Sequence, residues 1–143
     1  MTEWLRFSEG CYAAGQPTTT QLAALAAAGV RTVINLRTPR EQDDADEVAV
    51  LQRLGVAYLR LPIASAADLE RERVRQFGQA LDRARRDGDV LVHCASANRV
   101  GALVALDQAF NRGQTPSEAL AVGRSAGLAA LEPAVIALLG LPA

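Results

Sequence analysis

Residues 89–104 read Asp89-Val-Leu-Val-His-Cys-Ala-Ser-Ala-Asn-Arg-Val-Gly-Ala-Leu-Val104, and this stretch decides the fold. Its first part, up to His93, is a short apolar run typical of a strand buried on both faces. From Val100 to Phe110 the chain is apolar on nearly every helical face, which predicts a buried helix. Cys94 therefore lies at a turn between a central strand and the helix that follows it.

Apolar runs rich in β-branched residues alternate with amphipathic segments on both sides of this unit. That order predicts βα units around a mostly parallel sheet. We expect strands near residues 10–14, 30–36, 56–61 and 89–93, and helices near 19–28, 43–54, 69–86, 100–110, 116–125 and 132–139. The predicted architecture is one α/β domain over residues 1–143, with four to five strands flanked by helices in three layers.

The composition excludes several classes of protein. Half of the residues are hydrophobic and 22% are charged, as in a globular domain. The 15 basic and 16 acidic side chains nearly cancel, so there is no overall field to hold nucleic acid or an anionic membrane. The sequence also lacks a signal-peptide core and an apolar run of ~18 residues. We therefore expect a cytoplasmic protein with no nucleic-acid or membrane partner.

Cys11 and Cys94 are the two cysteines, and they stand far apart in unlike contexts. Such sparse use fits a reducing compartment better than a disulfide scaffold, and it leaves Cys94 available for chemistry. His93 is the one histidine, whereas a zinc site wants three or four convergent ligands. We expect no metal and no organic cofactor.

The turn after the strand has the composition of an anion site. A short loop at a helix N-terminus directs successive N–H groups into one concavity, where the helix dipole adds positive potential. The planar fork of Arg99 can donate two parallel hydrogen bonds to phosphate oxygens. Both effects favour the thiolate form of Cys94, so we predict a cysteine nucleophile there rather than a packed core cysteine. The predicted phosphate-binding residues are Ala95, Ser96, Ala97, Asn98, Arg99 and Val100.

Three more segments match a known family in order and spacing: Gly15-Gln-Pro17, Gly29-Val-Arg-Thr-Val-Ile-Asn-Leu-Arg37 with Pro39 and Glu41, and Gly55-Val-Ala-Tyr-Leu-Arg-Leu-Pro-Ile63. With the His93-Cys94 loop they make the chain resemble bacterial phosphatase-like proteins related to tyrosine and dual-specificity phosphatases, often called β-lactamase-hydrolase-like. The resemblance implies a cysteine-phosphatase-like fold and hydrolysis of phosphomonoesters through a phosphocysteine at Cys94. It further implies that Arg99 binds phosphate, that His93 helps to hold the thiolate, and that the substrate is a phosphorylated small molecule or protein.

Three features of the loop keep other functions open. Only four residues separate Cys94 from Arg99, as in a sulfurtransferase loop, so a persulfide on Cys94 is one alternative. Ala97 stands where the family commonly has glycine, and a positive φ there would cost ~1 kcal/mol. Val100 replaces the hydroxyl residue that phosphatases usually place after the arginine. The last two features are compatible with a catalytically weak protein that binds phosphate or sulfate.

A phosphatase also needs an acid to protonate the leaving oxygen. Asp68 is the nearest carboxylate behind the third predicted strand and is our candidate, although an N-cap for a helix beginning at Leu69 is the interpretation we favour. For Arg37, Arg40 and Glu41 we favour an exposed ion pair over a role at the rim of the pocket.

Overall fold

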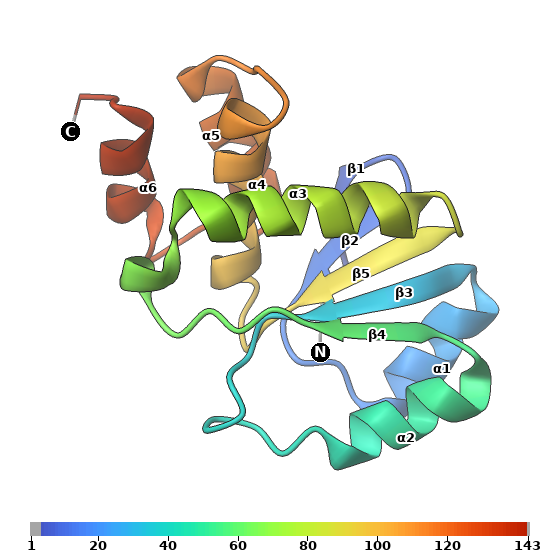
Figure 1. The fold of residues 1–143 in the computed structure, drawn as a ribbon. Coiled ribbons are helices and arrows are strands. Elements are labelled where there is room, and N and C mark those ends of the chain that lie inside the picture. The colour runs from blue at the N-terminus through green and yellow to red at the C-terminus, as the bar shows by residue number, and fades with distance from the viewer. Residues whose placement is uncertain (1–3, 143) are drawn as a thin grey trace.

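The computed structural model describes residues 4–142 as a five-stranded sheet between two layers of helices (Figure 1). The strands are β1 (Leu5–Ser8), β2 (Cys11–Ala14), β3 (Val30–Asn35), β4 (Ala57–Arg60) and β5 (Asp89–His93). The helices are α1 (Thr19–Ala27), α2 (Ala45–Leu54), α3 (Arg71–Arg85), α4 (Asn98–Phe110), α5 (Pro116–Ser125) and α6 (Glu132–Leu139), with a short 3-10 helix η1 (Ala66–Asp68) before α3. The predicted three-layer α/β architecture is confirmed.

The strand order β1-β2-β5-β3-β4 places β5 in the middle of the sheet. Only β1, which was not predicted, runs antiparallel, and it pairs with β2 through a hairpin. The other strands are parallel, and their carboxyl ends meet along one edge, where Ala14 is paired with His93, His93 with Asn35 and Asn35 with Arg60. In open parallel sheets this edge is where ligands bind.

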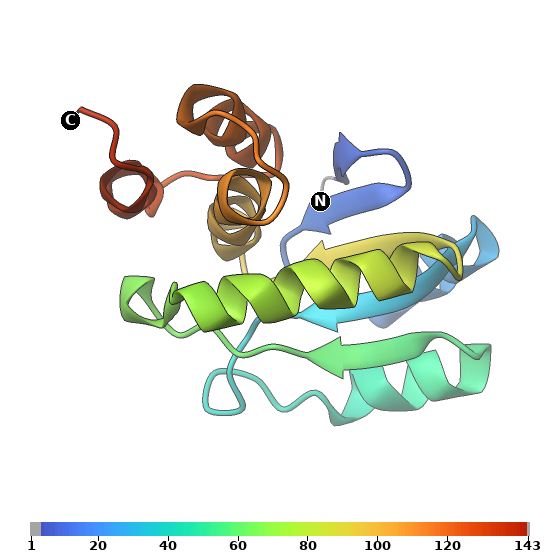
Figure 2. The ribbon, with the colours of Figure 1, turned by 45° about the horizontal axis from the view of Figure 1, so that its top comes forward.

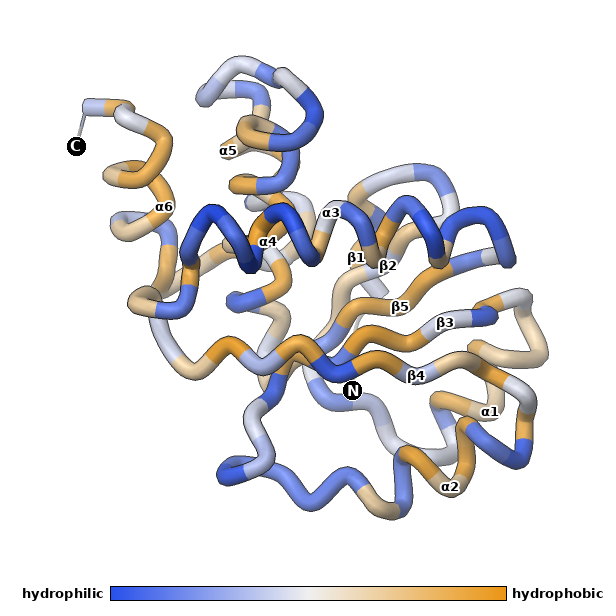
Figure 3. The backbone as a smooth tube through the Cα atoms, in the orientation of Figure 1, coloured by the Kyte–Doolittle hydropathy of each residue, from blue (hydrophilic) through white to orange (hydrophobic). Residues whose placement is uncertain are grey.

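Each face of the sheet has its own hydrophobic core. Helices α1 and α2 cover one face and α3 to α6 the other (Figure 2). Figure 3 shows that the residues along β5 and β3 are mostly hydrophobic, whereas those of α3, on the outside, are largely hydrophilic. The predicted buried helix is confirmed, because the residues of α4 from Val100 to Asp107 are all buried. No helix in the described part of the chain is both long enough and apolar enough to cross a membrane.

The start of α3 differs from the prediction. Ser65 begins the separate turn η1, where its hydroxyl accepts the N–H of Ala67, and Leu69 then leaves helical geometry with ψ 58°. Helix α3 starts at Arg71 after the N-cap residue Glu70. The expectation that Asp68 caps a helix beginning at Leu69 is therefore wrong.

Candidate active site

The turn that carries Cys94 is hydrogen-bonded through its backbone to the end of β2 and the segment that follows it. The backbone N–H of Cys94 donates to Ala14 O at 3.2 Å, and that of Gln16 donates to Ala95 O at 3.3 Å. Between them, Gly15 forms an isolated antiparallel bridge with Ser96. A Cβ on Gly15 would stand 2.8 Å from Ala95 O, so only glycine permits this close approach. The Gly-Gln-Pro segment thus fixes one side of the turn.

Ala97 gives the turn its shape. Its φ of 73° and ψ of −12° place it in the left-handed region, and it is the N-cap residue of α4. The sequence analysis named this residue as one where a positive φ would be strained, and the structure confirms that φ. Helix α4 starts immediately afterwards, with Gly101 N–H donating to Ala97 O at 2.9 Å. The first N–H groups of a helix have no carbonyl partner within it, so those of α4 are available to an anion.

A second segment supports the turn from behind. The side-chain oxygen of Asn98 accepts the N–H groups of Ala129 and Leu131 at 2.9 and 3.1 Å. Gly127 packs so closely that a Cβ there would lie 2.6 Å from Ala97 Cβ. These two hydrogen bonds tie the start of α4 to the segment at residues 129–131. The Val100 side chain is fully buried.

Arg99 is held with its guanidinium beside the turn. Nη1 and Nη2 donate to the two Glu41 carboxylate oxygens at 2.5 and 2.8 Å, and Nη1 also donates to Ile63 O at 2.8 Å. Hydrogen bonding to Glu41, opposed by burial and aided by the charge and hydrogen bonding of Cys94, raises the pKa of Arg99. The Arg99 side chain is 14% exposed and does not point into solvent, and it is close enough to Cys94 for the two charges to interact. The same ion pair lowers the pKa of Glu41 to about 2.

The two cysteines differ in their surroundings rather than in their exposure. Neither has any exposed surface, and neither is in a disulfide. Both lie in the same hydrophobic core cluster, where burial raises the pKa of the Cys11 thiol. Cys94 has Arg99 beside it and the N-terminus of α4 in front of it. The two cysteines therefore differ in the neighbouring charge and helix end, not in burial.

Glu47 was not predicted from the sequence, and Glu41 was predicted to pair with Arg37 or Arg40, or to lie at the rim of the pocket, but not to bind Arg99. Glu41 was expected in an exposed ion pair, and it does contact Arg37 at 3.3 Å, but its main partner is Arg99. Glu47, on α2, is 4% exposed, and its Oε2 lies 2.6 Å from His93 Nε2. The family pattern already contained Glu41 but not its partner, which lies 58 residues further along the chain. Glu47 lies in an acidic stretch that begins at Asp43, and no motif distinguishes it there.

Asp68 is engaged outside the turn. Its carboxylate accepts the Ala64 N–H at 2.7 Å and pairs with Arg73 at 2.6 Å. These two hydrogen bonds lower the pKa of Asp68, so the group is ionised at neutral pH. A general acid must carry a proton, and Asp68 does so only if substrate binding changes these contacts.

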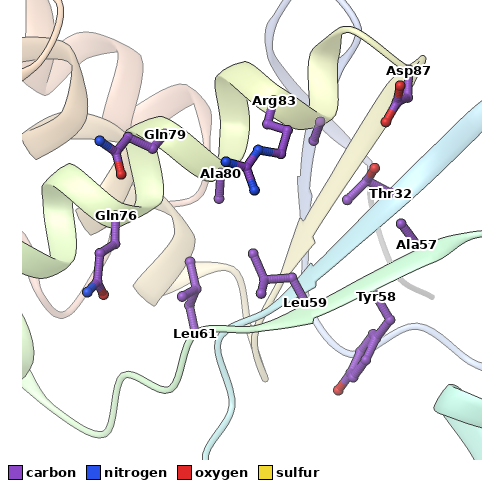
Figure 4. Close-up of a pocket in the computed structure, with 11 residues that line it drawn as sticks. Thr32, Ala57, Tyr58, Leu59, Leu61, Gln76, Gln79, Ala80, Arg83 and Asp87 are labelled. Atoms are coloured by element: carbon purple, nitrogen blue, oxygen red, sulfur yellow. The ribbon is translucent and has the colours of Figure 1, made fainter.

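Two of the described cavities lie along α3 rather than in the turn. One of about 360 Å³ runs between α3 and β4, with Leu59, Leu61 and Ala80 among its lining residues (Figure 4). A smaller one of about 120 Å³ reaches Ile63, whose carbonyl holds Arg99. Within residues 4–142, no group of three or more His, Cys, Asp or Glu side chains is placed to hold a metal ion.

Comparison with known proteins agrees with this geometry. Residues 6–131 match a family described as a DSP-PTPase phosphatase fused to NAD+ kinase. A β-lactamase hydrolase-like protein of Xylella fastidiosa is 33% identical over 118 residues, which are 79% of this chain but only 26% of that protein. The solved structure of P. aeruginosa TpbA is 26% identical with a TM-score of 0.75, covering 96% of this chain and 83% of that one. TpbA with a cysteine-to-serine substitution, in complex with phosphotyrosine, gives 25% identity and a TM-score of 0.74 over 94% and 80% of the two chains. The chain belongs to the DSP-PTPase phosphatase family.

Proposed function

We propose that this chain is a cysteine-dependent phosphomonoester hydrolase and that residues 1–143 act as one catalytic domain. The observation that carries the proposal is the place of Arg99, whose guanidinium is bound to Glu41 and is close enough to Cys94 for their charges to interact, beside the N-terminus of α4. A cation, a thiol and free helical N–H groups at one point form the arrangement that phosphoryl transfer to sulfur requires.

The chemistry runs in two steps. The Cys94 thiolate attacks phosphorus, so that an S–P bond forms while the P–O bond to the leaving group breaks and the leaving oxygen takes a proton. Water then attacks the phosphocysteine, the S–P bond breaks, and inorganic phosphate and the thiolate are released. Backbone N–H groups of residues 95–100 and the Arg99 fork bind the phosphoryl oxygens in both steps. Asp68 is the proposed acid for the first step, once a bound substrate has displaced its contacts.

The substrate class follows from the relatives. TpbA was solved with phosphotyrosine, which supports an aryl phosphate monoester, free or on a protein, as substrate here. The chain spans about a quarter of the β-lactamase hydrolase-like relatives, so activities of those whole proteins do not transfer directly. Both cysteines are free, which suits a reducing cytoplasm.

The test is hydrolysis of p-nitrophenyl phosphate by the wild type, by Cys94→Ser and by Cys11→Ser as matched control. We expect Cys94→Ser to abolish turnover and Cys11→Ser, which alters a cysteine remote from the anion site, to retain it. Activity that survives in Cys94→Ser refutes the nucleophile. No activity in the wild type, with phosphate still bound, supports the anion-binding alternative.

The four-residue spacing between Cys94 and Arg99 still favours one rival, a sulfurtransferase that carries a persulfide on Cys94. This rival predicts cyanide-dependent formation of thiocyanate from thiosulfate. Thiocyanate formation without phosphate release would replace the phosphatase assignment.

A further inference from the structure

The connection between β3 and α2 carries Glu41, but it contains no helix or strand of its own. Residues 36–44 leave the end of β3 and turn at residues 39–41 before α2 begins (Figure 1). Backbone carbonyl groups outside regular structure still need hydrogen-bond donors. The order of this connection therefore depends on groups that bind it from other elements.

Arg60, the last residue of β4, binds this connection with its whole guanidinium group. Its Nε donates to Arg37 O at 2.9 Å, and its Nη2 donates to Thr38 O at 3.1 Å and to Gln42 O at 3.3 Å. Nη2 also donates to Gln42 Oε1 at 3.2 Å, and Nη1 pairs with Asp44 Oδ2 at 3.0 Å. Within the described part of the chain, all polar partners of this guanidinium thus lie in residues 37–44.

The acceptors lie on both sides of the turn that presents Glu41. The Glu41 N–H donates to Thr38 O at 3.2 Å, and the Thr38 N–H donates to Glu41 Oε1 at 2.9 Å, so the carboxylate is folded back onto its own turn. Arg60 binds the carbonyl oxygens of Thr38 and Gln42, which flank the turn. It therefore fixes where the Glu41 carboxylate stands relative to β4.

The position of Glu41 in turn sets the orientation of Arg99. Its two carboxylate oxygens accept hydrogen bonds from Nη1 and Nη2 of Arg99 at 2.5 and 2.8 Å. Such a two-point contact fixes the direction of a guanidinium as well as its distance. An anion bound at the turn after Cys94 then meets Arg99 in the orientation that Glu41 imposes.

The surroundings of Arg60 suit a fixed contact. Its side chain is 16% exposed, and its partner Asp44 also accepts the Tyr58 hydroxyl at 2.5 Å. A half-buried guanidinium with several hydrogen bonds is held more firmly than a single ion pair on the surface. The ammonium group of a lysine has one nitrogen and cannot reproduce the planar fork that reaches residues 37, 38 and 42 together.

We propose that Arg60 is a positioning residue for the anion site, which acts on Arg99 through Glu41 by fixing the connection between β3 and α2. Without Arg60, three backbone carbonyl groups of this connection lose their donor, and the Glu41 carboxylate no longer holds Arg99 in one orientation. The effect on turnover rests on the proposed function. The effect on phosphate binding does not, because it requires no nucleophile.

The first test is binding of inorganic phosphate, measured by isothermal titration calorimetry. We expect Arg60→Ala to raise the Kd about tenfold, since a misplaced Arg99 loses about one hydrogen bond to a charged group. Arg60→Lys, which keeps the charge without the fork, should also bind phosphate more weakly than the wild type. Arg53→Ala is the matched control and should keep the wild-type Kd, because Arg53 is exposed at the end of α2 and has no hydrogen bond or ion pair among the described residues.

A double-mutant cycle separates positioning through Glu41 from a general effect on stability. In protein that already carries Glu41→Ala, we expect Arg60→Ala to leave the Kd for phosphate nearly unchanged, because the link to Arg99 is already broken. Additive effects of the two substitutions overturn the inference, as does a wild-type Kd in Arg60→Ala. If Arg60→Ala does not fold, as judged by urea unfolding, the same cycle with Arg60→Lys decides.

Hydrolysis of p-nitrophenyl phosphate by the same proteins distinguishes this inference from the proposed function. A wild type that hydrolyses the ester, together with additive effects at residues 41 and 60, overturns only the role of Arg60. A wild type that binds phosphate and shows the non-additive cycle but does not hydrolyse the ester overturns only the proposed function.

Discussion

Gly127 and Gly113 offer a matched pair of substitutions that isolates the contact behind the turn that carries Cys94. Both have a positive φ, 101° and 72°. At Gly113 an added Cβ meets nothing within 4 Å, so alanine there costs only the backbone strain, about 1 kcal/mol. At Gly127 the Cβ would lie 2.6 Å from Ala97 Cβ and 3.1 Å from Ala97 O. Relieving that clash adds about 1–3 kcal/mol, so we expect Gly127→Ala to lose about 2–4 kcal/mol in total.

Urea unfolding of the two variants measures this difference, and p-nitrophenyl phosphate hydrolysis reports its effect on the turn. Ala97 lies between Cys94 and Arg99, so a shift that accommodates the new methyl group moves the anion site, and about 1 Å of misplacement costs about 100-fold in rate. Gly113→Ala should keep wild-type kcat/KM. Equal losses of unfolding free energy in the two variants, or full activity in Gly127→Ala, would show that residues 127–131 do not support the turn.

Three further predictions concern the carboxylates. Glu41→Gln should lower kcat/KM about 10–100-fold because Arg99 loses its orienting anion, and Asp43→Asn should not; equal activity of Glu41→Gln and the wild type would contradict the orienting role. Because the folded-state pKa of Glu41 is about 2, below its ordinary 4.5, the stabilisation by ionised Glu41 is present above pH 4.5 and is lost as the pH falls toward 2. In chemical denaturation at neutral pH, the free energies of unfolding of the wild type and Glu41→Gln should differ by about 1–2 kcal/mol after solvent screening, and the two values should converge in acid. A difference that does not change with pH would refute this origin of the stabilisation. Asp68→Asn should lower kcat about 100-fold on an alkyl phosphate if Asp68 is the acid, and an unchanged kcat would remove it from the mechanism.

The local sequence pattern was sufficient to predict most of the strands and helices. Apolar runs predicted β2 to β5, and the apolar stretch after Val100 predicted the buried helix α4, because burial on every side requires apolar residues on every face. Strand β1 was not predicted because it is only four residues long and contains Arg6 and Ser8. Its pairing with β2, rather than its composition, makes it a strand. The start of α3 was misplaced because a preferred capping residue was present at Asp68 but the chain used it in a separate turn.

The candidate site also has one part that could be predicted from a single segment and another part that could not. Cys94, Arg99 and the turn between them are close in sequence, so their chemistry could be inferred from the segment itself. Glu41 and Glu47 act on Arg99 and His93 across 58 and 46 residues. Such pairs form only when β3 and β5 lie side by side, because the loop and helix after β3 then face the end of β5. No spacing rule within one segment can supply them.

The shape of the anion site is itself a tertiary property. An alanine in the left-handed region is disfavoured by about 1–2 kcal/mol in isolation, so the turn does not hold Ala97 there by local preference. It is held from two sides, by Gly15 and Gln16 on the backbone of Ala95 and Ser96, and by Asn98, which binds residues 129 and 131. The absence of glycine at residue 97 is therefore compatible with an ordered anion site, provided that both supports are intact. Loss of either support should affect the turn before it affects the sheet, since the strands pair independently of both.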